Sequence, residues 1–156
     1  MLIDCPPAIV LRYAAYDEAF SGRDAAALQA IETPDFRDTD PDGTVRELKG
    51  ATKNQGRFFA MVNSMTLTSK VKCARVAEDR AEAWATMTMD AVYTPPGTRP
   101  RKLHQVYVNH DVWEKIDDQW RLASQTTTKL DGTDDGKEIH EKLCYTGGRS
   151  CQTRAL

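Results

Sequence analysis

The sequence lacks an excess of charge of either sign, which argues against a nucleic-acid-binding protein. Lysine and arginine total 21 against 23 aspartates and glutamates, and the two signs are interspersed. A nucleic-acid interface needs basic residues gathered on one face or along one helix. No apolar run approaches the ~20 residues that cross a bilayer, and residues 1–7 lack the charged and apolar regions of a signal peptide. We therefore expect neither a nucleic-acid nor a membrane partner.

The four cysteines include no C-x-x-C pair, so the sequence supports neither a thioredoxin-type site nor a zinc knuckle. Cys73 falls on the apolar face of a predicted strand, where we expect a buried thiol. Cys144 and Cys151 flank a Gly-Gly turn and would close a disulfide loop in an oxidising compartment. The spacing alone does not decide whether this disulfide forms. We predict a cytoplasmic protein, with a secreted or periplasmic one as the alternative if these two cysteines are bonded and a leader was removed.

The first third of the chain has the periodicity of short amphipathic helices. Apolar residues recur at helical spacing from residue 9 to residue 20, namely Ile9, Tyr13, Tyr16 and Phe20. Pro6 and Pro7 suit the start of this helix and Gly22 its end. Asp24 is placed to cap a second helix over residues 25–31, and a third is expected over residues 51–62.

Between the second and third helices, a strand over residues 36–40 should turn at Asp42-Gly43 into a short extended piece near residues 45–48. From residue 65 onward the period changes to two, which indicates half-buried strands over residues 65–73, 81–93, 102–116 and 120–127. Helices followed by consecutive long antiparallel strands predict an α+β fold with helices on one face of a curved sheet. Residues 1–129 should form the domain. Residues 130–156 should form a polar, separable tail with a short helix over residues 137–143.

The strand over residues 102–116 has two different faces. One carries polar and aromatic side chains: Leu103, Gln105, Tyr107, Asn109, Asp111 and Trp113. The other carries Val106, Val108 and Val112 together with two histidines. The period alone does not choose between them. One arrangement lines a cavity with the polar-aromatic face and packs the valine face against another layer, such as a second subunit.

The order of these elements resembles the nuclear transport factor 2-like superfamily, in its SnoaL-like and ketosteroid isomerase-like branch. The similarity covers roughly residues 8–127 and is carried by four motifs: Arg12-Tyr-Ala-Ala15, Asp24-Ala-Ala-Ala-Leu28, Thr39-Asp-Pro-Asp-Gly43 and the segment from Asp111 to Trp120. It implies a cone-shaped α+β half-barrel, with three N-terminal helices on a curved, mainly antiparallel sheet around a deep cavity. It also implies a homodimer that binds a small apolar or amphipathic molecule. Isomerases, cyclases, dehydratases and non-enzymes share this fold.

The resemblance to the steroid isomerases implies three catalytic positions. Asp40, followed by proline, is similar to their general base, whereas Tyr13 and Asp111 are similar to their oxyanion donors. Such a site would abstract a proton beside a carbonyl without a cofactor. We also expect a set of ligand-contacting residues: Tyr16, Phe59, Tyr107, Asn109, Trp113 and Gln125.

Each of these positions also has a purely structural interpretation. Asp40-Pro-Asp-Gly is ordinary turn chemistry, and a tyrosine on a packed stripe is commonly a core residue. Tyr16-Asp17 with His104 and His110 superficially resembles a scytalone dehydratase set, but the histidines should lie about 20 Å apart. Asp131–Gly136 resembles a calcium loop without its final glutamate, so no metal is expected. A non-catalytic ligand-binding or assembly domain therefore remains the alternative to an enzyme.

Overall fold

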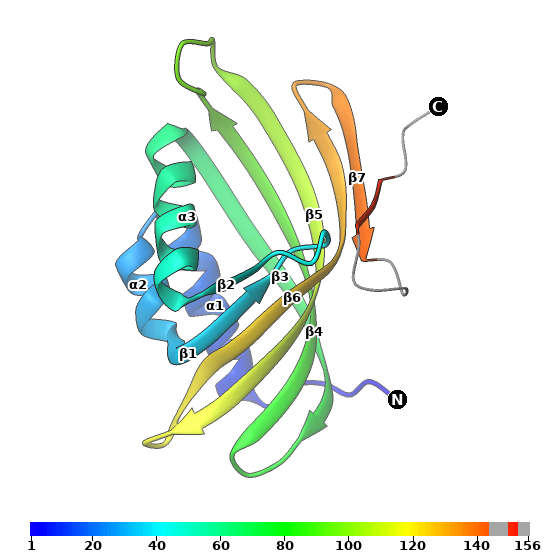
Figure 1. Ribbon diagram of the computed structural model, residues 1–156. Coiled ribbons are helices and arrows are strands. Elements are labelled where there is room, and N and C mark those ends of the chain that lie inside the picture. Colours follow the sequence, from blue (N-terminus) through cyan, green and yellow to red (C-terminus); the bar gives the residue numbers. More distant parts are fainter. Residues whose placement is uncertain (144–149, 153–156) are drawn as a thin grey trace.

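Three helices cover one face of a curved sheet in the computed structural model, which describes residues 1–143 and 150–152 (Figure 1). The helices are α1 (Pro7–Ser21), α2 (Ala25–Ile31) and α3 (Leu48–Met61). The strands are β1 (Glu32–Thr39), β2 (Val45–Glu47), β3 (Val62–Val76), β4 (Arg80–Tyr93), β5 (Arg101–Ile116), β6 (Gln119–Asp134), β7 (Lys137–Leu143) and β8 (Ser150–Gln152). The predicted α+β half-barrel is confirmed, and α2 has the predicted bounds.

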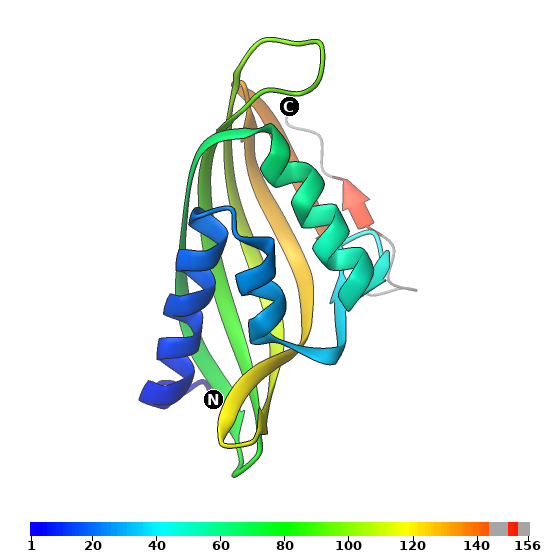
Figure 2. The ribbon, with the colours of Figure 1, turned by 90° about the vertical axis from the view of Figure 1, so that its left-hand side faces the viewer.

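The strands pair in the order β2-β1-β6-β5-β4-β3, and β1 and β6 pair in parallel while the other described pairs are antiparallel. The long strands β3 to β6 curve around the helices, which lie together on the concave side (Figure 2). The edge of β6 is shared by two partners. Its first half pairs with β1, and residues 129–134 pair with β7.

The core lies between the helices and the concave face of the sheet. On β4 the inward positions carry either small or flexible residues, all of them buried: Ala83, Ala85, Met87, Met89 and Ala91. The alanines leave room for the α1 tyrosines, and the methionines fill the irregular space beside them. The polar-aromatic face of β5 is the concave one, because its members Asn109, Asp111 and Trp113 are buried.

The segment over residues 137–143 is a strand, so the predicted short helix is wrong. β7 forms a hairpin with β6, and Lys137 pairs with Asp134 across the turn. The sequence Lys-Glu-Ile-His-Glu-Lys-Leu is polar enough for either structure when it is taken alone. The free edge of β6 selects the strand by supplying a row of backbone hydrogen bonds. β6 itself continues to Asp134, beyond the predicted end of the domain at residue 129.

Cys73 is buried as predicted, but it is bonded to Cys5 instead of being a free thiol. The two Cα atoms are 4.9 Å apart, and Ile3 makes two backbone hydrogen bonds with Cys73. The N-terminal segment is therefore fixed to the edge of β3. The expected bond between Cys144 and Cys151 involves residues outside the part of the chain whose side chains the structure describes.

We predict that the Cys5–Cys73 bond contributes about 2–4 kcal/mol to the free energy of unfolding, because it closes a long loop in the unfolded chain. The double variant Cys5→Ala/Cys73→Ala should unfold at correspondingly lower denaturant concentration. Wild-type protein measured in a reducing agent is the control and should match the variant. Equal unfolding midpoints for oxidised and reduced wild type would contradict this contribution.

Candidate functional site

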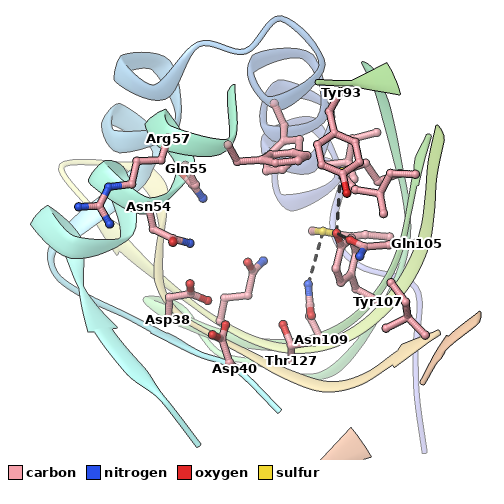
Figure 3. Close-up of a pocket in the computed structure, with 18 of the residues that line it drawn as sticks. Asp38, Asp40, Asn54, Gln55, Arg57, Tyr93, Gln105, Tyr107, Asn109 and Thr127 are labelled. Atoms are coloured by element: carbon pink, nitrogen blue, oxygen red, sulfur yellow. Dashed lines mark hydrogen bonds between the residues drawn. The ribbon is translucent and has the colours of Figure 1, made fainter. Parts of the chain in front are cut away.

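A cavity of about 500 Å³ lies between the helices and the concave face of the sheet (Figure 3). One part of its wall is apolar and is built from Phe20, Phe58, Met61, Leu67, Met87, Met89 and Leu103. The other part is polar and includes Tyr16, Asp38, Asp40, Asn54, Asn109, Gln125 and Thr127. A cavity of this size and mixed lining suits a small amphipathic molecule.

Two carboxyl groups from the end of β1 reach the polar part of the wall. Asp38 lies on β1 and Asp40 directly follows its last residue, Thr39, so the extended chain places both side chains on the same face. Figure 3 shows them side by side. Burial, together with the negative charge of Asp40, raises the pKa of Asp38 to about 6, whereas Arg46 opposes that rise.

Arg46 lies next to this carboxyl pair on β2. Its guanidinium is 2.7 Å from the Asp40 carboxylate and 3.7 Å from that of Asp38. Asp40 is the more exposed of the two acids. The two carboxyl groups therefore differ in character, since Asp40 is the close charge partner of Arg46, whereas Asp38 is the less exposed acid and has a pKa raised to about 6.

Tyr13 and Asp111 form a hydrogen-bonded pair behind the cavity wall. The Tyr13 hydroxyl donates to Asp111 at 2.6 Å, and the tyrosine ring packs edge-on against Trp113. Burial raises the pKa of Asp111 to about 7, although the hydrogen bond from Tyr13 opposes that rise. The predicted proximity of Tyr13 and Asp111 is thus present, but neither residue is among those that line the cavity.

Tyr16, one helical turn beyond Tyr13, is a buried residue that lines the cavity. Its bond to Gln125 is long, at 3.4 Å, which leaves the hydroxyl proton available to another acceptor. Burial and the nearby Glu32 and Asp38 raise its pKa well above the usual value, so it acts as a neutral hydrogen-bond donor. Burial and the charge of Asp38 likewise raise the pKa of Glu32 to about 8.

Of the nine predicted site residues, five line the cavity: Asp40, Tyr16, Tyr107, Asn109 and Gln125. The other four, Tyr13, Asp111, Phe59 and Trp113, are buried behind it. The resemblance implied that Tyr13 and Asp40 act on one substrate, but Tyr13 does not line the cavity with Asp40, because its hydroxyl donates to Asp111 and its ring packs against Trp113. The tail predicted to be separable supplies two lining residues, Asp134 and Ile139.

The two histidines of β5 lie on the opposite face of the sheet. His104 contacts Asp90 at 2.7 Å, and the ring of His110 packs against Trp84. Asp17 accepts hydrogen bonds from the backbone and hydroxyl groups of Ser69. None of these residues lines the cavity. The geometry therefore gives no support to a catalytic set like that of scytalone dehydratase.

The SnoaL-like domain model matches residues 13–123, most of the chain. The protein belongs to the SnoaL-like domain family. Among curated proteins, none matches its sequence.

Solved structures similar to this SnoaL-like protein share its fold at low sequence identity. A candidate aromatic ring hydroxylase from Novosphingobium aromaticivorans has a TM-score of 0.71 and 18% identity, covering 83% of this chain and 96% of its own. A candidate scytalone dehydratase from the same organism has a TM-score of 0.67 and 16% identity, covering 81% of this chain and 82% of its own. A type 2 hexachlorocyclohexane dehydrochlorinase, LinA, has a TM-score of 0.61 and 14% identity, covering 96% of this chain and 88% of its own.

Three side chains of the SnoaL-like site were missed from the sequence: Asp38, Glu32 and Arg46. Asp38 carried a usable signal, because it precedes Asp40 by two residues and shares its strand face. Glu32 carried none, since an acid at a helix end is normally exposed. Arg46 became relevant only through the pairing of β2 with β1, which sets it opposite Asp38.

We predict that the buried acids make stability depend on pH. The pKa values of Glu32 and Asp111 are about 8 and 7 in the folded protein, above those of an unfolded chain. The folded state therefore holds protons more tightly. The associated stability is fully present below about pH 4 and is lost as pH rises through 7 to 8.

Glu32→Gln should remove part of this dependence. Its free energy of unfolding relative to wild type should increase by about 2–4 kcal/mol between pH 5 and pH 9, because the amide never ionises. Asp35→Asn, an exposed carboxylate on the same strand, controls for the loss of one charge. Parallel stability curves for wild type and Glu32→Gln would contradict the burial of a protonated Glu32.

Proposed function

We propose that the protein is an enzyme that moves a proton on a small amphipathic molecule, using cofactor-independent acid–base chemistry of the isomerase or cyclase/dehydratase kind. The observation that carries the proposal is a cavity in which the partly buried carboxyl of Asp38, with a pKa of about 6, shares the wall with Tyr16, whose raised pKa keeps it neutral. A general base works best when its pKa lies near the working pH.

In the proposed reaction Asp38 removes a proton from a carbon beside a carbonyl group. Tyr16 donates a hydrogen bond to the oxygen on which negative charge develops, and the amide groups of Asn109 and Gln125 orient the polar end of the substrate. The apolar wall holds the rest of the molecule. This scheme moves the base from Asp40 to Asp38, and the donor from Tyr13 to Tyr16. Asp111 and Tyr13 then support the wall from behind.

A non-catalytic ligand-binding or assembly domain is the second candidate. An assembly domain would fill its interior with bulky apolar side chains, whereas here the cavity extends to two carboxyl groups. That difference favours the enzyme. A binding protein would have the same cavity but would show no proton exchange, and the test below separates the two.

The test measures exchange of carbon-bound hydrogen in D₂O for a panel of cyclic and aromatic ketones. We predict that Asp38→Asn lowers the exchange rate by about 10²- to 10⁴-fold, because the amide keeps the shape but cannot accept a proton. Tyr16→Phe should lower it by about 10²-fold. Asp35→Asn and Tyr13→Phe are the matched controls and should have much smaller effects. Failure of wild type to exchange any ketone would favour the binding protein.

The proposal includes a homodimer formed through the convex face of the sheet. The described helices lie on the concave side. The convex side presents Val106, Val108 and the partly exposed Trp84, whereas Val112, which we expected on the same valine face, is buried. Apolar groups gathered on one open face are characteristic of protein interfaces.

We predict a dimer by sedimentation at micromolar concentration, and a monomer for Val108→Glu, since a charge at the centre of the interface would be buried without a partner. Leu11→Glu places the same charge at an exposed apolar position on α1 and should leave the dimer intact. A monomeric wild type would refute this interface.

The predicted cytoplasmic location is not supported by the disulfide between Cys5 and Cys73. Structural disulfides persist mainly in oxidising compartments, so this bond favours the secreted or periplasmic alternative. No described helix is long and apolar enough to cross a membrane.

A further inference from the structure

The Asp40-Pro-Asp-Gly turn places Arg46 opposite Asp38. Within the turn, the Asp40 N–H donates to the Thr44 carbonyl group, and the Thr44 N–H donates to the Asp42 side chain. Gly43 adopts a positive φ of 87°, a conformation that favours glycine. The hairpin that follows pairs Asp38 with Arg46 in register. A turn with this much internal bonding fixes where the Arg46 side chain begins.

The guanidinium of Arg46 is shared unequally by two acids. Its close partner is Asp40, at 2.7 Å, and its distance to Asp38 is 3.7 Å. Arg46 is not among the residues that line the cavity, whereas both acids are. Because Asp38 and Arg46 are direct cross-strand partners, the cation lies beside Asp38 on the same face of the hairpin but is not among the side chains that line the cavity.

We infer that Arg46 is a positioning residue, which keeps Asp38 in its carboxylate form while Asp40 holds the guanidinium back from a close ion pair with Asp38. This inference rests on the proposed role of Asp38 as the base. Without Arg46, burial and the charge of Asp40 would raise the pKa of Asp38 further, so a smaller fraction of it would be in the carboxylate form at neutral pH. With a direct Arg46–Asp38 pair, the carboxylate would be too weak a base.

Other ionisable groups face Asp38 from the surrounding elements. They are Glu32 on β1, Asp111 on β5 and Tyr16 on α1. Arg57 on α3 also lines the cavity. Burial keeps Tyr16 and Glu32 mainly neutral at neutral pH, so they add little charge. Among the described residues, the cation within ion-pair distance of Asp38 is Arg46.

Removing Arg46 and removing the charge of Asp40 should shift the pKa of Asp38 in opposite directions. Arg46→Gln removes the cation, so the pKa of Asp38 should rise by about one unit or more above 6. Asp40→Asn removes the like charge and releases Arg46 to approach Asp38, so the pKa should fall. A side chain that merely supported the fold would not shift the pKa in two directions.

Carbon-13 NMR of labelled aspartate carboxyl groups measures this directly, with the Asp38 signal assigned by its loss in Asp38→Asn. Arg46→Lys should keep the Asp38 pKa close to wild type, because the positive charge remains. Arg37→Gln is the matched control, since Arg37 is an exposed arginine on β1, and should cause no shift. An Asp38 titration that Arg46→Gln leaves unchanged, or that Asp40→Asn moves upward, would overturn the inference.

The NMR titration does not depend on turnover, so failure of this inference differs from failure of the proposed function. Opposite shifts of the Asp38 pKa without ketone exchange would support the positioning role of Arg46 and reject the enzyme. Ketone exchange that depends on Asp38 but not on Arg46, with the Asp38 pKa unchanged in Arg46→Gln, would support the enzyme and reject the positioning role of Arg46.

Discussion

The parallel pairing of β1 with β6 is the constraint on which the rest of the site depends. It sets Asp38 beside Gln125, and β5 on the other side of β6 pairs Gln125 with Asp111. Three neighbouring strands thus bring two carboxyl groups and an amide to one region under α1. If β1 moved by one residue, Asp38 and Asp40 would point away from the cavity, because side chains alternate along a strand.

Burial of several acids in one small region has a cost that the fold meets in different ways. Asp111 has a hydrogen bond from Tyr13, Asp38 has a cation nearby, and the carboxyl oxygens of Glu32 have no hydrogen-bond partner among the described residues. An unpartnered buried carboxyl stays protonated, which explains its high pKa. The three acids therefore have distinct protonation behaviour although they lie close together. Chemistry that needs both a base and neutral donors benefits from such a separation.

The sequence was sufficient to predict the three helices and the long strands, because hydrophobic period distinguishes a helix from a strand, but it did not decide which face of β5 is concave. It was not sufficient to predict which of two residues on the same face of a helix or strand lines the cavity. Tyr13 and Tyr16 share one helix stripe, and Asp38 and Asp40 share one strand face, so periodicity cannot decide which member reaches the cavity. The Cys5–Cys73 bond and the strand β7 were missed for a related reason. Both depend on contacts with a partner strand, which local sequence does not encode.

The Asp40-Pro-Asp-Gly motif shows how a structural and a functional interpretation of the same residues can be joined. The motif makes an ordinary turn, as its composition predicts. The turn, however, returns the chain at the register that sets Arg46 opposite Asp38. A longer or looser turn would keep both residues but change the distance between charge and carboxyl, on which the electrostatic effect depends. The motif therefore matters through the geometry of its turn, which sets the distance between Arg46 and Asp38. Asp40 adds to this by binding the Arg46 guanidinium.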